Sequence, residues 1–524
     1  MTDLPKGWTV ATMGDLLLAI QAGKSLKCEE RPPKENERGV VKVSAVTWGT
    51  FDAAQSKTLP KSFEPMSDTA IKAGDFLFSR ANTLELVGAV VLVRNDHPNL
   101  FLSDKILRLD LDPALKPWLL KYLQSLEGKR KLAAVSTGNQ ASMRNIGQNE
   151  LKSVSIPLPP LNEQRRIVEK IEAMFERIDK GAENLRGAKA TLALYRQSLL
   201  KSAFEGKLTA DWRAQNADKL ETPKTLLARI QKERETRYKS ALDDWQTALA
   251  EWRAGGEVGR KPGKPGRPPE IIGEAVFPSG KVAQVPTSWR WSPMSDVGRT
   301  SGGLTKNQKR ESLARKAKYL RVANIYSNEL RLDHISEIGV TDEEFSKSRL
   351  EKGDLLFVEG NGSLDQIGRV AVWDGSIPDI THQNHLIRFS PDGLLDSQFA
   401  MLFMISPVGR DLIKAQASST SGLHTLSISK IANLPVPICS PAEQAEIIRI
   451  LDARLTAADR MEAEIDAALS RSGALRQSIL KRAFAGSLVP QDPTDEPAPT
   501  LLARIKAERA KAGKTKPRKT AHAG

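Results

Sequence analysis

The chain has 524 residues, enough for two to four domains, and its 78 Lys and Arg against 63 Asp and Glu give a formal net charge of +15. A balance this basic favours a polyanionic partner, most commonly nucleic acid, although ribosomes and anionic membrane surfaces attract the same charge. The sequence has no uninterrupted apolar run of about 18 residues, lacks the basic start of a signal peptide, and has only two cysteines, Cys28 and Cys439. These features exclude a disulfide framework or a Cys-rich zinc site, and we expect a cytoplasmic protein that does not use a membrane.

Residues 1–157 predict a globular domain. Short β-like runs, among them VVKVSAV, FLFS, VGAVVLV and KILRLDL, are separated by Gly, Asn and Pro, and a helical segment, PWLLKYLQSL, follows them. This pattern indicates an α+β fold with a mixed or antiparallel sheet.

Residues 158–208 predict a long helix that starts at about Asn162, after the proline-rich IPLPPLNEQ. Apolar or small residues recur along it at alternating spacings of four and three over four heptads, as in a coiled coil. An apolar stripe of this kind needs a partner. The predicted seam contains Ile167, Ile171, Met174, Ile178, Gly181, Leu185, Ala188, Leu192, Tyr195 and Leu199.

Residues 209–284 begin as a further charged helix, ETPKTLLARIQKERETRYKSALDDWQTALAEWR. They continue as a Pro/Gly-rich basic linker, RAGGEVGRKPGKPGRPPE, whose composition has no means of forming a core. The linker is basic enough to contact phosphate, although a solvated surface segment is the simpler interpretation.

The chain then repeats itself with an offset of 280 residues. RQSLLKSAFEGKL (196–208) matches RQSILKRAFAGSL (476–488) at nine of thirteen positions, and IPLPPLNEQ matches VPICSPAEQ. LPKGW near the start likewise matches VPTSW at 285–289. Self-similarity at this period indicates duplicated domains.

The repeat predicts a second globular domain at 285–437 and a second helix at 438–488. A basic tail at 489–524 is predicted to be disordered, although it repeats the TLLARI of residues 225–230. The second seam contains Ile447, Leu451, Arg454, Ala458, Met461, Ile465, Ala468, Ser472, Leu475 and Ile479.

Two equivalent helices in one chain are natural partners. We expect them to pack as an antiparallel coiled coil with pseudo-twofold symmetry, separating two similar globular domains. The alternative is that each helix packs independently on its own domain.

Catalytic motifs in the sequence are weak. AGKS at 22–25 lacks the first glycine of a phosphate loop, and Glu150-x-Lys152 is replaced by Lys430 and Ala432 in the second copy. His382 and His385 have the spacing of metal ligands, but the sequence places no third ligand near them. We therefore expect no catalytic, cofactor or metal site in this chain.

The two copies differ most in their polar loops. SRANTLELVG (79–88) stands where the second copy has VEGNGSLDQIG (358–368). A shared scaffold with different loops suits a split, asymmetric DNA sequence with one half-site per domain. Basic and amide side chains of these loops are candidates for contacts with bases or phosphates, although any single one of them is better explained as a solvated surface group. The candidates are Lys24, Lys27, Lys42, Arg80, Asn82, Lys306, Asn307, Lys309, Arg310, Asn324 and Asn361.

The order of these segments resembles the specificity subunit of type I restriction–modification enzymes. The resemblance covers nearly the whole chain and rests on IPLPPLNEQRRIVEKIE and RQSLLKSAFEGKLTADWR, with PICSPAEQ departing somewhat in the second copy. It implies a non-catalytic reader of double-stranded DNA with two target-recognition domains.

The same resemblance implies partners that supply the chemistry. Two methyltransferase subunits would modify adenine at N6 with S-adenosylmethionine, and ATP- and Mg²⁺-dependent translocase–nuclease subunits would cleave unmodified DNA. Alternatives are a methyltransferase-only complex, a coiled-coil scaffold without sequence-specific DNA binding, or a single-chain nuclease or methyltransferase.

Overall fold

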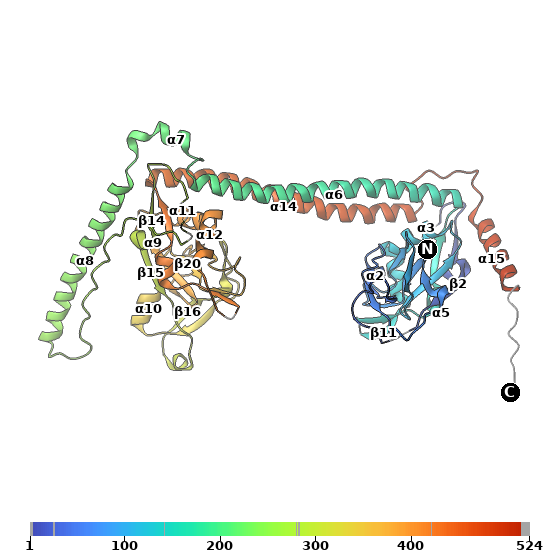
Figure 1. Cartoon of the computed structure of the whole chain (residues 1–524), viewed down its shortest axis with the longest axis horizontal. Helices are drawn as coiled ribbons and strands as arrows, with labels where there is room; N and C mark the ends of the chain where they lie inside the picture. The colour runs from blue at the N-terminus through green and yellow to red at the C-terminus, as the bar shows by residue number, and fades with distance from the viewer. Residues whose placement is uncertain are drawn as a thin grey trace. The chain divides into compact units, whose positions relative to one another are not determined.

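The computed structural model describes residues 4–514 apart from 25, 26, 141, 279, 281, 282 and 421. It divides into unit 1, Met1–Gly187 with Ile465–Gly524, and unit 2, Ala188–Glu464. The two long helices, α6 (Leu161–Phe204) and α14 (Pro441–Phe484), therefore each contribute one half to each unit. Each unit also holds one sheet-rich head: head one is residues 4–158, and head two is residues 285–438 (Figure 1).

Head one is built on antiparallel pairings with one parallel exception. Its sheets have the strand orders β2-β10-β6-β8, β4-β3-β9-β5, β11-β12-β7 and β1-β13, and among these described strands the β3–β9 pair alone is parallel. The strands are β1 (Thr9–Thr12), β2 (Leu17–Ala22), β3 (Gly39–Val41), β4 (Ser56–Thr58), β5 (Ala70–Ile71), β6 (Phe76–Ser79), β7 (Ala81–Asn82), β8 (Val90–Leu92), β9 (His97–Phe101), β10 (Ile106–Leu111), β11 (Thr137–Gln140), β12 (Met143–Asn145) and β13 (Ser155–Leu158). Its helices are α1 (Met13–Leu16), α2 (Ser44–Thr47), α3 (Lys116–Gln124), α4 (Leu126–Val135) and α5 (Gln148–Ser153).

Head two repeats this plan. Its sheets have the orders β15-β24-β20-β22, β19-β16-β23, β21-β26-β25, β17-β18 and β14-β27, and the β16–β23 pair is parallel. The strands are β14 (Arg290–Pro293), β15 (Gly298–Gly302), β16 (Lys316–Leu320), β17 (Ile325–Tyr326), β18 (Glu329–Leu330), β19 (Ser336–Gly339), β20 (Leu355–Val358), β21 (Gly360–Asn361), β22 (Val370–Val372), β23 (Ile380–His382), β24 (Leu386–Pro391), β25 (Ser418–Thr420), β26 (Leu423–Thr425) and β27 (Pro435–Ile438). Its helices are α9 (Met294–Val297), α10 (Asp342–Ser348), α11 (Ser397–Ile405), α12 (Pro407–Gln416) and α13 (Ile428–Ala432). The predicted α+β class with a mixed sheet is confirmed for both heads.

The central strands explain why the heads are layered. Successive side chains of a strand point to opposite faces, and FLFS and LLFV are apolar on both. In β6, Phe76 and Phe78 join the cluster around Trp118 of α3, whereas Leu77 joins a second cluster with Val41 of the other sheet. Each head therefore stacks helices, a central sheet and a second sheet.

The repeated EQ motif joins each head to the helix that follows it. The indole N–H of Trp8 donates to Glu163 Oε2 at 3.0 Å, and that of Trp289 donates to Glu443 Oε2 at 2.9 Å. The adjoining Gln164 side chain donates to the carbonyl oxygen of Pro159. The matching LPKGW and VPTSW segments therefore each supply the tryptophan donor of a buried hydrogen bond. In both copies the glutamate acceptor lies over 150 residues later in the chain.

The repeated helix ends pack on the head of the other copy. Phe204, at the end of α6, lies edge-on to Phe399 and Phe403 of α11, with ring centroids 5.3 and 5.2 Å apart. Phe484, at the end of α14, lies edge-on to Trp118 and Tyr122 of α3 at 4.9 and 5.1 Å. The alternative, in which each helix packs only on its own head, is therefore wrong.

The glycine of the repeated AFxGxL motif ends both helices. Gly206 and Gly486 have φ of +70° and +68°, the left-handed conformation that glycine adopts without a steric cost. A Cβ atom at either position would lie 2.3 Å from a proline ring, Pro286 of head two or Pro5 of head one. Glycine thus serves both the turn and the close packing.

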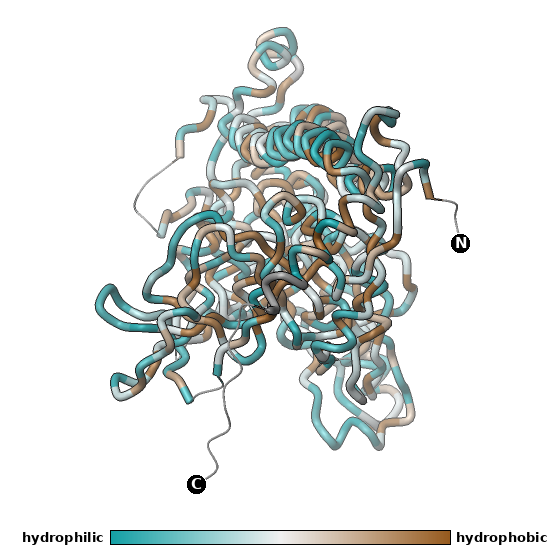
Figure 2. The backbone as a smooth tube through the Cα atoms, turned by 90° about the vertical axis from the view of Figure 1, so that its right-hand side faces the viewer, coloured by the Kyte–Doolittle hydropathy of each residue, from teal (hydrophilic) through white to brown (hydrophobic). Residues whose placement is uncertain are grey.

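Within each unit the two helices lie side by side and antiparallel (Figure 1). In unit 1, Arg476 pairs with Asp179, and its guanidinium lies 5.0 Å from the centre of the Phe175 ring. In unit 2, Lys189 pairs with Glu462 and Arg196 with Asp459. Residues later in α6 pair with residues earlier in α14, which confirms the predicted antiparallel pairing. Along these helices the tube in Figure 2 is largely hydrophilic, with hydrophobic positions at intervals.

The predicted seam is correct near the heads and only partly correct between them. Ile167, Ile171, Leu199, Ile447, Leu451 and Ile479 are buried, and Met174, Ile178, Leu185, Leu192 and Ile465 are half-buried. Met461 and Leu475 are not buried, because 57% and 50% of their surface is exposed, although Leu475 still lies at the pair, where it lines a groove with Ile178 and Leu185. Gly181, Ala188 and Tyr195 are also exposed, whereas Ala182 and Ala458 are buried. Away from the heads two helices bury only a narrow stripe, and small alanines form it.

The segments outside the heads are more structured than their composition predicts. The predicted charged helix is confirmed as α7 (Ala210–Gln215) and α8 (Pro223–Ala254), but Leu226, Leu227 and Ile230 of α8 enter the core of unit 2. Arg234 forms a buried ion pair with Asp392 at 2.9 Å. The basic linker itself, residues 253–270, lies on the surface as predicted, with only Pro262, Pro265 and Pro268 half-buried; beyond it, Ile271 and Phe277 are partly buried and pack against that core.

The predicted disordered tail contains a docked helix. Residues Ala498–Lys514 form α15, and its Ala498, Leu501 and Ile505 are buried in the core of unit 1. Lys506 pairs with Asp15 at 3.0 Å, and the backbone N–H of Ala498 donates to the carbonyl oxygen of Gly7. The two TLLARI segments therefore have matching roles, one on each head. Residues 515–524 lie outside the described part of the chain.

Candidate nucleic-acid interface

Head one gathers lysines around a shallow pocket of about 380 Å³. Lys24, Lys42, Lys57 and Lys105 line it from four separate segments, with Glu30 as one of two carboxylates. Lys42 and Lys57 both pair with Glu30, which spaces the ammonium groups without neutralising all of them. The sequence prediction included Lys24 and Lys42 but missed Lys57, which lies within β4, and Lys105, which directly precedes β10.

Gly23 explains how the AGK segment reaches this pocket. A Cβ atom there would lie 1.7 Å from the carbonyl oxygen of Leu102, so only glycine permits the approach. Gly303 of head two is in the same position against His382. The glycine that suggested a phosphate loop is therefore a packing requirement that places Lys24 at the pocket.

Arg80 and Asn82 adjoin the pocket. Arg80 directly precedes β7, and Asn82 is the last residue of β7. The backbone N–H of Arg80 donates to the carbonyl oxygen of Lys105, and its side chain donates to Asn145 at 3.2 Å. Asn82 faces Arg144 of β12 across the strand pair. Its amide nitrogen lies 3.4 Å from Thr47 Oγ1, and its oxygen accepts from the backbone N–H of Thr83. Lys27 is exposed and does not line this pocket.

In head two the equivalent candidates fall into two groups. Lys306 and Asn307 are exposed on the loop that leads into a short 3-10 helix, Gln308–Ser312, and Lys309 is exposed within that helix. Asn361 lies on β21 opposite His424, and its side-chain oxygen accepts from the backbone N–H of Ser363.

Arg310 and Asn324 are committed to holding the fold of head two. Arg310 forms a bidentate pair with Glu344 at 2.8 and 2.9 Å, and this pair lowers the pKa of that carboxyl to about 2. Asn324 is buried, donates to the carbonyl oxygens of Arg331 and His334, and accepts from the backbone N–H of Arg321. With these groups occupied, neither side chain is presented to a ligand, so the structure disfavours both as DNA contacts.

The two heads differ in charge at one superposable hydrogen bond. Where Arg80 donates through its backbone to Lys105 in head one, Glu359 donates through its backbone to His385 in head two. The His385 ring also lies 2.9 Å from the Glu359 carboxylate. Two cations in one copy are thus replaced by an acid–imidazole pair in the other, which are groups with different preferences for bases and phosphates.

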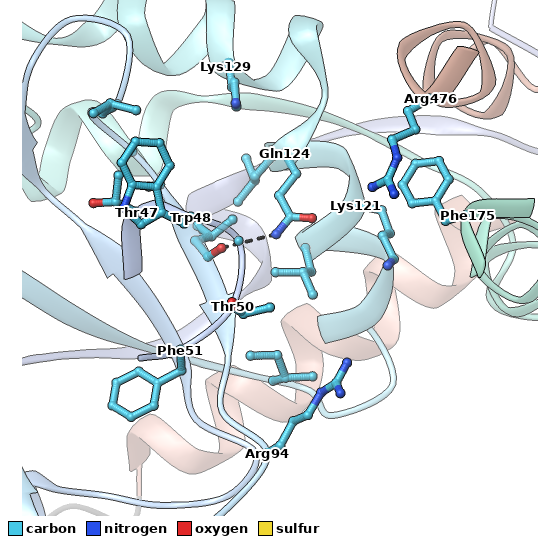
Figure 3. Close-up of a pocket in the computed structure, with 18 of the residues that line it drawn as sticks. Thr47, Trp48, Thr50, Phe51, Arg94, Lys121, Gln124, Lys129, Phe175 and Arg476 are labelled. Carbon is cyan, nitrogen blue, oxygen red and sulfur yellow. Dashed lines mark hydrogen bonds between the residues drawn. The ribbon is translucent and has the colours of Figure 1, made fainter. Parts of the chain in front are cut away.

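Head one also has a wide cleft that Figure 3 shows. It has a volume of about 880 Å³ and lies between the 47–51 loop, α3, and the α6 and α14 segments of unit 1. Arg94, Lys121 and Arg476 are among its cations, and Trp48 stands at its rim with 75% of its surface exposed. In head two the hairpin β17–β18 contacts the strand equivalent to β8, with the N–H of Asn328 donating to Val370. The heads therefore differ in shape as well as charge.

His382 and His385 have separate environments. His382 is buried beside the carbonyl oxygen of Ser348 at 3.2 Å, and burial lowers its pKa to about 3. His385 is exposed and faces Glu359. Burial likewise raises the pKa of the Cys439 thiol well above its usual value. Over residues 4–514, with the gaps noted above, no group of three His, Cys, Asp or Glu side chains has a metal-binding arrangement.

A family model described as the type I restriction modification DNA specificity domain matches residues 5–185 and again residues 286–471. The chain belongs to this family. The two matches cover the two heads and the first part of each long helix, so the duplication of the sequence is a duplication of the family domain. The resemblance inferred from the repeated motifs is confirmed, and membership establishes recognition of DNA sequence within a type I restriction–modification system as the general role.

Several specificity subunits are similar over most of their length. That of the type I restriction enzyme EcoKI from Escherichia coli K12 is 24% identical over 533 residues, covering 97% of each chain. That of StySPI from Salmonella potsdam is 23% identical over 528 residues, again covering 97% of each. The EcoEI subunit of Escherichia coli is 32% identical over 192 residues, which is 36% of this chain and 32% of that protein.

A solved structure supports the fold. It concerns complex assembly and conformational transition of the type I restriction–modification system, and it aligns with 93% of this chain and all of its own at a TM-score of 0.58 and 18% identity. In the described part of this specificity subunit, no helix has both the length and the apolar character to cross a membrane.

Proposed function

We propose that this specificity subunit recognises a bipartite, asymmetric DNA sequence, with one half-site bound by each head. The observation that carries the proposal is the replacement of Arg80 and Lys105 by Glu359 and His385 at equivalent positions of an otherwise repeated scaffold. Equal scaffolds with unequal contact groups are what two different half-sites require.

The basic pocket of head one supports a role in binding the DNA backbone. Four lysines outnumber two carboxylates around it, and Arg80 adjoins it through Lys105. In head two the exposed Lys306, Asn307 and Lys309 are the corresponding candidates. We assign phosphate contacts to the lysines, and base contacts to Arg80, Asn82 and Asn361.

The helix pair is proposed to dock two adenine-N6 methyltransferase subunits, to which ATP-dependent nuclease subunits can be added. Unit 1 has an apolar groove along the pair, lined by Ile178, Leu185 and Leu475 among others. Unit 2 exposes Leu194, Tyr195 and Met461 on the same two helices. Apolar surface left open on both halves of the pair suits two copies of one partner. S-adenosylmethionine, ATP and Mg²⁺ would be used by those partners, and this chain would carry no catalysis.

The test begins by mapping methylated adenines in host DNA with and without the gene, which yields the target sequence. Binding of the full chain with its partner subunits is then measured on duplexes in which either half-site is scrambled. Arg80→Ala is expected to cost about 1–3 kcal/mol at the head-one half-site and to leave the other unaffected. Arg130→Ala, which removes an exposed cation of α4 in the same head away from both the basic pocket and the wide cleft, is the control. Equal losses at both half-sites, or equal affinity for target and scrambled DNA, would reject bipartite recognition in favour of a scaffold role.

A further inference from the structure

The linker after α8 is held against that helix. The indole N–H of Trp245 donates to the carbonyl oxygen of Pro262 at 3.0 Å, and that of Trp252 lies 3.3 Å from the carbonyl oxygen of Gly259. Residues later in the linker bond to residues earlier in α8, so the chain turns back after the helix and runs antiparallel beside it (Figure 1). We call residues 259–268 the basic strap.

The basic strap has a three-residue repeat of a cation, a proline and, in its first two copies, a glycine: Lys261-Pro262-Gly263, Lys264-Pro265-Gly266 and Arg267-Pro268. The prolines are half-buried, whereas the cations and glycines are exposed. A proline-rich extended chain has three residues per turn and a rise of about 3.1 Å per residue, so cations three apart share one face at roughly 9 Å intervals. The repeat therefore turns prolines toward α8 and a row of charges toward solvent.

A short acidic helix joins the basic strap to the candidate DNA loop of head two. The three acids that open α10 are each paired with an arginine from a different place: Asp342 with Arg315, Glu343 with Arg260 of the strap, and Glu344 with Arg310. Arg310 and Arg315 flank the end of the loop that carries Lys306 and Lys309. The strap and this loop thus converge on one turn of helix.

The charges of the row are available to a ligand. Among the described residues, Lys261, Lys264 and Arg267 form no ion pair with a carboxylate, and the Lys264 ammonium lies 5.8 Å from the centre of the Trp245 ring. Nearby, the α10 carboxylates are already neutralised by the arginines. An exposed row of cations beside a loop that carries further lysines is complementary to a line of phosphates.

We propose that the basic strap is a second DNA-binding element, which contacts the phosphate backbone of the duplex flanking the half-site of head two. The inference rests on the proposed function, because the strap meets the flank of whichever duplex head two holds, with or without its preferred half-site. The strap adds affinity without adding sequence preference, since phosphate contacts carry no base information.

The test uses the full chain carrying K261Q, K264Q and R267Q together. Binding to target and scrambled duplexes is measured between 50 and 200 mM salt. Each lost phosphate contact reduces the slope of log K against log salt by about 0.9, so the slope should fall by about 2.7 on both DNAs. Over this fourfold range the variant should therefore lose about 40-fold less affinity than the unsubstituted chain.

Two controls separate the strap from general charge and from folding. K170Q, K180Q and R186Q remove the same charge from exposed positions of α6 and should leave the slope unchanged. W245F with W252F removes only the two indole donors that hold the strap, and should lower the slope partially while leaving the unfolding midpoint of unit 2 nearly unchanged.

The position of the strap is tested by the length of the duplex. Shortening the DNA beyond the head-two half-site should abolish the difference between the triple variant and the unsubstituted chain, whereas shortening the other end should preserve it.

An unchanged slope in the triple variant, or an equal fall in the α6 control, overturns the inference. So does normal DNA binding accompanied by failed assembly with partner subunits, which would assign the strap to an acidic protein surface. If target and scrambled DNA bind equally, bipartite recognition fails, while the slope still decides whether the strap contacts phosphate.

Discussion

Phe204→Ala tests whether the helix ends are exchanged between the two copies. The Phe204 ring is 1% exposed and packs edge-on against two phenylalanines of head two. Truncating a buried phenylalanine costs about 3–5 kcal/mol, because apolar contacts are lost and a cavity remains. Edge-to-face partners of this kind each account for about 0.5–1.5 kcal/mol. The whole loss should fall on unit 2, although Phe204 belongs to the first copy of the repeat.

The assay is scanning calorimetry with limited proteolysis, which assigns each unfolding transition to a unit. The unit 2 transition should fall by about 6–20 °C, given about 2–4 °C per kcal/mol for a domain of this size, while unit 1 is unaffected. Phe484→Ala should do the reverse. Leu194→Ala, on the same helix but 66% exposed, is the control and should change stability by less than about 0.5 kcal/mol. If Phe204→Ala lowers the unit 1 transition instead, the exchanged packing is refuted.

Two further predictions concern buried titratable groups and are read from urea unfolding of each unit. Burial raises the pKa of Glu163, so its ionised form weakens unit 1 as pH rises, and Glu163→Gln should leave unit 1 unchanged or more stable at pH about 7.5. The equivalent Glu443 also accepts from Arg213, so Glu443→Gln should destabilise unit 2 by about 1.5–3 kcal/mol; equal effects of the two changes would contradict this contrast. Because the folded pKa of His382 is about 3, unit 2 should lose about 1.4 kcal/mol per pH unit as pH falls below about 6.5, and His382→Gln should flatten this dependence whereas His385→Gln should not. A slope that persists in His382→Gln would show that another group titrates.

The duplication, the fold class and the antiparallel pairing could be predicted because each leaves a repeated pattern in the sequence. Strand alternation, the heptad spacing and the matched motifs report on local geometry, which the sequence encodes directly. The role of the motifs could not be predicted in the same way, because Glu163 meets Trp8 and Phe484 meets Trp118 only through the tertiary fold. A repeat shows that both copies need a residue, but not which copy it contacts.

The candidate DNA residues were predicted from residue type and loop position alone. Neither property shows whether a side chain is already bonded within the fold, and the structure disfavours the two candidates that are. Arg310 and Asn324 have the chemistry of base contacts, yet a carboxylate and two backbone carbonyls occupy them. Lys57 and Lys105 were missed because a lysine in a short strand or directly before one is common, and only the pocket brings them together with Lys24. The basic composition of the tail likewise gave no sign of α15. Its few buried apolar residues are enough to dock the helix because head one offers an apolar surface to them.

Unit 1 is formed by two segments that lie far apart in the sequence, and this sets the order in which the two units can be completed during synthesis. Unit 2 is one continuous segment, so all of its core emerges from the ribosome before residue 465. Head one must wait for Phe484 and α15 to fill the surface around Trp118, a delay of over 300 residues, or roughly 15–65 s at ordinary translation rates. The first domain to be translated is therefore the last to be completed. Until then it carries an open apolar site that a chaperone can bind, and a ribosome stalled late in the message leaves that site uncovered.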